Sequence, residues 1–81
     1  ITDVNIPLMN NTDYFLNSVK VKIDYIKDSQ FASGDIYKTE YIEFLNISPH
    51  TKLFKKAPDS DRGTKINYSI ISIKSEELNY N

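Results

Sequence analysis

One short acidic loop has the residue types and spacing of a cation site. Asp59 and Asp61 stand at alternate positions ahead of Gly63, as in the opening of some calcium-binding loops. A complete loop of this kind also requires an oxygen ligand at its fifth position and a bidentate glutamate at its twelfth, where this chain has Gly63 and Ile70. The pattern therefore favours a tight turn, in which Asp59 caps backbone amides and Gly63 adopts a positive φ. Asp59 and Asp61 remain the candidate metal ligands of the sequence.

The sequence holds few groups that could catalyse a reaction. It has no cysteine, which excludes disulfides, thiol catalysis and zinc sites built on thiolates. Its two glycines are too few for a Walker or dinucleotide-binding loop. The one histidine, His50, lies in a polar turn with no acid at a sequence spacing that would orient it, so we expect a solvated side chain. A nucleophile and a carboxylate from elsewhere in the fold could still form a triad with it, so this arrangement stays open. These observations predict a protein that is not an enzyme and has no cofactor.

Aromatic side chains are the other candidate binding groups. Six tyrosines and four phenylalanines are interleaved with lysines, as on surfaces that stack sugars or single-stranded nucleic acid. Tyr25 and Tyr68 fall in phase with valine and isoleucine, which predicts that they lie in the core. The net charge of −1 and the single arginine argue against nucleic acid as the partner. The predicted interaction residues are therefore two tyrosines and the acidic loop: Tyr37, Tyr41, Asp59, Asp61 and Arg62.

These candidate residues must be positioned by β-strands, because the dominant period of the sequence is two. Over residues 19–25, apolar and charged residues alternate at every position, which places one apolar face against a core. Residues 36–47 form a second run with apolar residues on both faces, which indicates a central strand or a bulge. Residues 65–74 form a third run that changes phase, which indicates a bulge or a strand covered on both sides.

Two shorter runs are predicted to be edge strands. Pro7 lacks an amide hydrogen, so the strand over residues 4–8 belongs at a sheet edge. The strand over residues 51–56 carries three lysines, which protect an edge against pairing with other chains. Turn-forming residues separate all the runs, with clusters at 10–13, 28–35, 48–50 and 58–63.

The 81 residues therefore predict one all-β domain. We expect a small antiparallel immunoglobulin-like β-sandwich, with a five-stranded OB-like barrel as the alternative. The domain spans residues 1–81, is a module or fragment of a longer chain, and has a frayed tail over residues 76–81. Apolar stretches reach only two or three residues, so no membrane insertion is expected. The predicted core is Val19, Val21, Ile23, Tyr25, Phe44, Leu53, Ile66, Tyr68 and Ile70.

The order of features along the chain resembles a known family. These features are the segment 10–14, Leu16, the alternating run 19–25, Gly34 and Pro49. In this order they resemble FxLYD-like and related immunoglobulin-like β-sandwich domains of bacterial lipoproteins and envelope proteins. Residues 57–63 are similar to short C-terminal modules of uncharacterised proteins from the Bacteroidetes lineage, and the resemblance covers residues 4–73. It implies a seven-strand-like sandwich, an extracytoplasmic setting (periplasm or cell surface) and no established activity, so it brings no catalytic residues.

The sequence leaves several functions open. The first is a non-catalytic accessory or protein-interaction module of a bacterial envelope-associated protein, contacting a protein partner or the rest of its parent chain through a sheet edge or the acidic loop. The alternative is a ligand-binding β module that uses exposed aromatics to bind carbohydrate or single-stranded nucleic acid. Self-association through edge strands is a further expectation.

Overall fold

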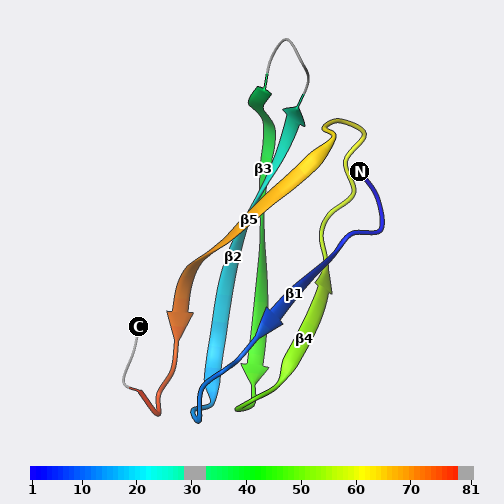
Figure 1. Cartoon of the computed structure of the whole chain (residues 1–81). Coiled ribbons are helices and arrows are strands. Elements are labelled where there is room, and N and C mark those ends of the chain that lie inside the picture. Colours follow the sequence, from blue (N-terminus) through cyan, green and yellow to red (C-terminus); the bar gives the residue numbers. More distant parts are fainter. Residues whose placement is uncertain (29–32, 79–81) are drawn as a thin grey trace.

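Every regular element in the described part of the chain is a β-strand (Figure 1). The computed structural model describes residues 1–28 and 33–78, so the turn expected within 28–35 lies partly outside the described residues. The strands are β1 (Asn5–Met9), β2 (Leu16–Asp28), β3 (Ser33–Ile47), β4 (Lys52–Lys56) and β5 (Lys65–Lys74). Each overlaps one of the five predicted runs, so the prediction of an all-β domain is confirmed. The strands β2 and β3 extend beyond their runs, and Asp28 and residues 33–35, which were expected in a turn, lie in these strands.

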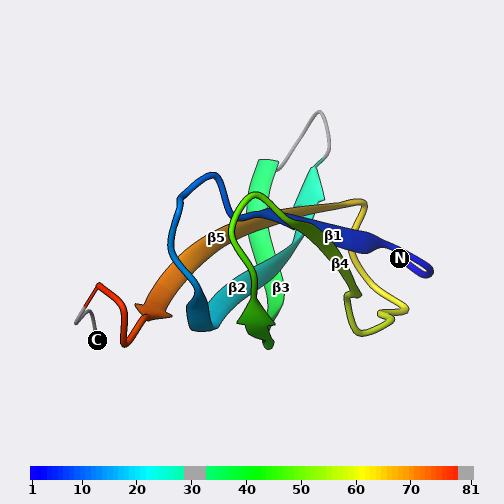
Figure 2. The same ribbon diagram turned by 90° about the horizontal axis from the view of Figure 1, so that it is seen from below.

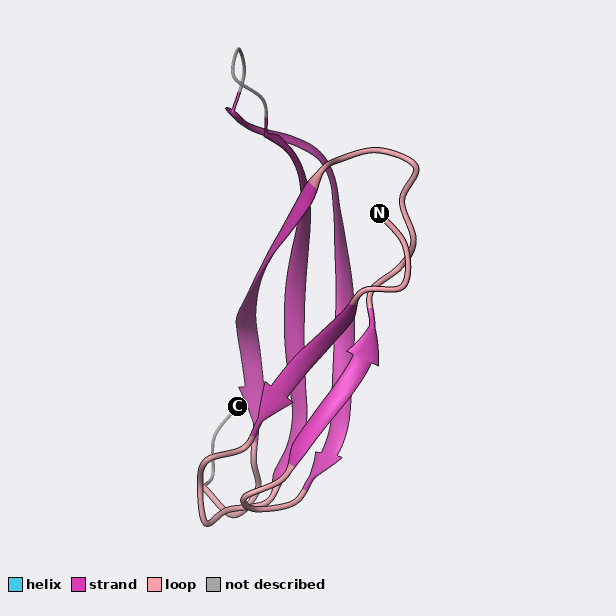
Figure 3. Cartoon of the chain, turned by 45° about the vertical axis from the view of Figure 1, so that its right-hand side comes forward, coloured by secondary structure: helices cyan, strands magenta, loops and turns pink. Residues whose placement is uncertain are grey.

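The strands form two antiparallel sheets. The small sheet contains β1 and β4, and the large sheet has the order β3-β2-β5. In Figure 3 the small sheet packs across the lower half of the large sheet, with β1 on the side of β4 that faces β5. The fold is therefore a small β-sandwich, and the barrel alternative is wrong because no strand joins the two sheets into a closed ring.

The core lies between the sheets and is centred on β2. Val19, Val21, Ile23 and Tyr25 are almost completely buried, as the alternation predicted. Phe44 and Ile42 of β3 lie opposite Val19 and Val21 in the register and share their face. The other buried residues of this core cluster come from the small sheet, the strand ends and the segment after β4: Ile6, Leu8, Leu16, Ile47 and Ala57.

The predicted core is wrong for two residues of β5. Tyr68 and Ile70 lie opposite Ile23 and Val21 of β2, so they are on the core face of the sheet, yet they are exposed. The reason is the size of the small sheet, which has two strands and therefore cannot cover all three strands of the large one. Leu53 and Ile66 are partly buried against the core.

Both long outer strands of the large sheet contain a bulge, which was one of the two explanations offered for the two-faced run 36–47 and for the phase change in the run 65–74. In β3, Lys38 pairs with Tyr25 and Ile36 with Ile26, so Tyr37 is the extra residue. In β5, Ser72 pairs with Lys20 and Ile70 with Val21, so Ile71 is the extra residue. Of the two explanations offered for each run, the bulge is correct. Neither strand is central in its sheet, because β2 occupies that position.

The free edge of β1 lacks a hydrogen-bond donor in its middle. Val4 and Asn10 flank β1. The backbone N–H of Asn10 donates to the Thr51 carbonyl, and the Val4 carbonyl accepts a hydrogen bond from the backbone N–H of Ala57. The even-numbered residues of β1 therefore direct their backbone groups toward β4. The odd-numbered residues, including Pro7, direct theirs away from β4. Pro7 therefore removes a donor from the exposed edge, which supports the prediction that β1 is an edge strand.

Candidate functional site

The acidic loop is bound to the N-terminal segment of the described chain. Ile1 and Ser60 exchange two backbone hydrogen bonds, with N···O distances of 2.5 and 2.8 Å. Asp59 accepts a hydrogen bond from the Asp3 amide at 3.3 Å. The Lys56 ammonium lies 3.4 Å from a carboxylate oxygen of Asp3 and 3.6 Å from one of Asp59. The carboxylate of Asp59 is thus already engaged by an ammonium group and an amide.

The loop is a turn, as predicted, but Ser60 rather than Asp59 provides its local capping. The Ser60 hydroxyl donates to the Arg62 carbonyl at 2.9 Å and accepts the Arg62 amide hydrogen at 3.1 Å. Gly63 has a φ of 95°, the positive value expected of it. Asp61 is exposed, and residues 1–28 and 33–78 contain no cluster of three side chains suited to a metal ion.

Tyr25 fixes this loop to the large sheet. Its ring is fully buried, and its hydroxyl donates a hydrogen bond to the Pro58 carbonyl. Lys38 of β3 lies over the same ring, 5.0 Å from its centroid, and donates to the Asp59 carbonyl at 3.3 Å. Burial raises the pKa of the Tyr25 phenol, and the negative charges of Glu40 and Asp59 raise it further.

This raised pKa predicts a loss of stability in alkali. The folded domain favours the neutral phenol, so the unfolded chain loses its Tyr25 proton first, and the free energy of unfolding falls as the pH rises above about 10. Below that pH the contribution is fully present. Urea unfolding between about pH 8 and 11 would measure the decline. Tyr25→Phe should flatten it, whereas Tyr41→Phe, at an exposed ring, should not; an equally steep decline in Tyr25→Phe would contradict this origin.

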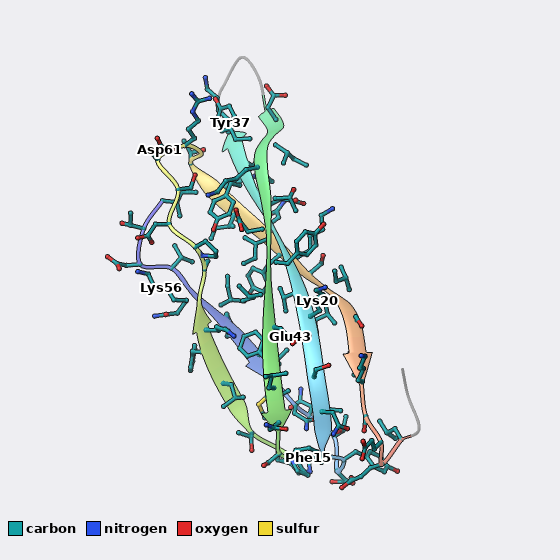
Figure 4. All side chains as sticks on the ribbon, turned by 180° about the vertical axis from the view of Figure 1, so that it is seen from behind. Phe15, Lys20, Tyr37, Glu43, Lys56 and Asp61 are labelled. Carbon is teal, nitrogen blue, oxygen red and sulfur yellow. The ribbon has the colours of Figure 1, made fainter. Side chains whose placement is uncertain are left out.

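The predicted interaction residues fall into two separate groups. Tyr37 and Asp61 lie at the same end of the molecule in Figure 4, the end that carries the acidic loop and therefore Asp59 and Arg62. Tyr41 lies four positions further along β3, about 13 Å away at the usual rise of a strand. Both tyrosine rings are exposed, as predicted. They do not form one continuous aromatic platform.

The surroundings of Tyr41 are polar. The Lys20 ammonium, near the middle of the molecule in Figure 4, lies 5.9 Å from the centroid of the Tyr41 ring. Asp24 accepts a hydrogen bond from Thr39 at 2.7 Å and lies 3.9 Å from the Lys22 ammonium. On this outer face of the large sheet, polar side chains near Tyr41 contact one another and the tyrosine ring.

His50 has an acidic partner that the sequence did not reveal. Its Nε2 lies 2.6 Å from a carboxylate oxygen of Asp13, although the two residues are far apart in the chain. Both side chains are mostly exposed, and His50 has a φ of 54° in its turn. No nucleophilic hydroxyl is hydrogen-bonded to this pair among the described residues. The prediction of a solvated turn histidine holds, and the acid beside it comes from a distant part of the fold, a possibility that the sequence had left open.

The largest uncovered apolar surface on the core face lies on β5, where the sequence predicted buried residues. Tyr68, Ile70 and Ile71 are 50%, 53% and 49% exposed, and we call these three residues the open shelf. Tyr68 and Ile70 continue the core face of the large sheet, and Ile71 is the bulge residue between them and Ile73. The alternation of β5 showed which side chains face inward, but it could not show whether another strand covers them.

The sandwich is closed on one side and open on the other. On the closed side, the Lys55 ammonium of β4 donates to the Glu43 carbonyl of β3 at 2.6 Å, which links the two sheets. On the other side, no described strand pairs with the outer edge of β1 or of β5, and the open shelf lies there. At the lower end of this side, Ser75 donates to the Phe15 carbonyl at 2.7 Å, and Figure 2 shows the segment from β1 to β2 beside β5.

Comparisons of the chain with protein-family models, curated proteins and solved structures find no match. Within the described part of the chain, no helix has the length and apolar character to cross a bilayer.

Proposed function

We propose that this domain is a non-catalytic protein-interaction module, carried by an envelope-associated bacterial protein, that binds an extended segment of its partner along β5. The single observation that carries the proposal is the open shelf. Exposed apolar residues are common on protein surfaces, but Tyr68 and Ile70 of the shelf lie on the core face of a sheet, in register with the buried residues Ile23 and Val21. A sheet face of this kind is normally covered.

The position of the shelf favours strand addition as the binding mode. β5 is a free edge of the large sheet, so an extended segment can hydrogen-bond to its backbone and place alternate side chains beside Tyr68 and Ile70. The other free edge on the same side is β1, where Pro7 removes a donor that such a segment would need. The β5 edge is therefore the better binding site of the two.

A ligand platform of aromatic side chains receives less support. Tyr37 and Tyr41 lie at different places on β3, and the polar groups around Tyr41 are engaged with one another. A single exposed ring with a lysine above it offers little area for stacking a sugar or a base.

A selection of extended peptides tests the proposed function. We expect a displayed library of random peptides to yield binders with apolar residues at alternate positions, and Ile70→Lys to weaken their binding about tenfold or more. The matched control is Ile36→Lys, because Ile36 is 56% exposed against 53% for Ile70 and lies on the opposite edge of the same sheet. Equal binding by both variants, or a selection without alternating binders, would argue against β5 as the site.

A further inference from the structure

We infer that the extended segment bound at β5 can be β5 of a second copy of this chain, in an antiparallel pair centred on Tyr68. This inference rests on the proposed function, because it uses the same edge and the same open shelf. It adds the identity of one partner and the register of the contact.

The strand around Tyr68 has a self-complementary sequence. Residues 66–70 are Ile-Asn-Tyr-Ser-Ile, in which apolar, polar and aromatic positions are arranged symmetrically about the tyrosine. A two-fold axis through Tyr68 makes the contact isologous, so the same surface meets itself. In this register Tyr68 lies opposite its own copy. The other opposed pairs are Ile66 with Ile70 and Asn67 with Ser69.

Each of these pairs is a favourable one. Residues directly opposite in an antiparallel pair share a face, so Ile66, Tyr68 and Ile70 of both copies lie together on the core face. Asn67 and Ser69 lie together on the outer face, where an amide and a hydroxyl can hydrogen-bond. The axis is perpendicular to the sheet, which puts both small sheets on the same side. The two shelves then meet in the space between those small sheets.

The charges and the ends of β5 agree with this register. Pairing along the whole strand would set Lys65 opposite Lys74 at both ends, an unfavourable arrangement of like charges. Pairing centred on Tyr68 sets Lys65 opposite Ile71 instead and leaves Lys74 outside the contact. The regular stretch ends at the Ile71 bulge, and the lower end of β5 is already flanked by the segment that contains Phe15.

The size of the contact predicts a weak dimer. Three half-exposed side chains per copy offer only a few hundred Å² of apolar surface, well below the total of about 1,200 Å² typical of stable complexes. We therefore expect a reversible monomer–dimer equilibrium with a dissociation constant on the order of 0.1 mM.

Engineered cysteines test the register, because the chain has no cysteine of its own. Asn67→Cys and Ser69→Cys are each prepared as single variants. The register places the thiol introduced by Asn67→Cys in one copy directly opposite the thiol introduced by Ser69→Cys in the other, at a Cα distance of about 4.5–5.5 Å that a disulfide can span. Under mild oxidation, we expect an equimolar mixture to give several-fold more disulfide-linked dimer than either variant alone. Equal yields in all three samples, or none in the mixture, would overturn the inference.

Sedimentation of the unmodified chain gives an independent measurement. The mean mass should rise toward the dimer between about 10 µM and 1 mM. Ile70→Lys should remain monomeric over this range, and Ile36→Lys should behave as the parent chain. A parent chain that stays monomeric throughout would overturn the second copy as partner, while the peptide selection would still decide whether β5 binds extended segments at all.

Discussion

Replacement of Tyr25 by alanine is expected to lower the free energy of unfolding by about 4 kcal/mol. Tyr25 is among the largest fully buried side chains, and its removal leaves a cavity in the core as well as an unpaired Pro58 carbonyl. A domain of 81 residues has a total stability of only about 4–12 kcal/mol. The variant is therefore expected to melt about 15–30 °C lower, measured by circular dichroism.

Two further variants separate the causes of this effect. Tyr25→Phe keeps the ring and removes only the hydrogen bond to Pro58, so it should cost about 1–2 kcal/mol. Tyr41→Ala removes an exposed tyrosine from the neighbouring strand and should change stability by about 0.5 kcal/mol or less. If Tyr25→Ala were no more harmful than Tyr41→Ala, Tyr25 would not be the anchor between the core and the acidic loop.

The second large effect is expected at Asn10, which joins three parts of the chain. Its side chain is buried, and its amide nitrogen lies 2.8, 3.2 and 3.0 Å from the carbonyl oxygens of Tyr14, Ile47 and Ser48. Its oxygen accepts hydrogen bonds from the amide and hydroxyl of Thr12 at 3.1 and 2.6 Å. Asn10→Ala leaves these groups unpaired and should cost about 3 kcal/mol, measured by urea unfolding.

The adjacent residue provides the matched control for Asn10. Asn11 is exposed, so Asn11→Ala should change the free energy of unfolding by about 0.5 kcal/mol or less. Asn10→Asp keeps the shape of the side chain but replaces its donors with a charged acceptor facing carbonyl oxygens, and should destabilise at least as much as alanine. A stable Asn10→Asp variant would show that side-chain volume, not hydrogen bonding, is what this position requires.

The strands were predictable because each one follows a local rule. Period-two alternation identified β2 from residues 19–25 and placed its inward face correctly, since the side-chain period of a strand depends only on its own residues. The missing amide hydrogen of Pro7 predicted an edge strand in the same local way. The glycine at position 63 predicted a positive φ in its turn. The phase change in the run 65–74 pointed to the bulge at Ile71, whereas the apolar residues on both faces of the run 36–47 suggested a bulge without locating it at Tyr37.

The open shelf and the His50 contact were not predictable, because they depend on how separate strands pack together. Tyr68 has the sequence context of a core residue, and only the two-strand width of the small sheet leaves it exposed. The contact between His50 and Asp13 joins two turns that no spacing rule relates. Asn10 belongs to a run of turn residues, and nothing in that run distinguishes a buried amide from its exposed neighbour Asn11.

The pairing of the strands also determines the order in which the chain can assemble. Only β2 and β3 are neighbours both in the sequence and in a sheet, whereas β1 with β4 and β2 with β5 join segments about 40 or more residues apart. The chain loses conformational entropy when those long loops close, before the contacts that they bring together stabilise the fold. We therefore expect a folding time in the millisecond-to-second range typical of all-β domains. Until the loops close, the β2–β3 hairpin exposes the apolar face that later becomes the core. Folding on this topology therefore passes through a stage at which that face is open to other chains.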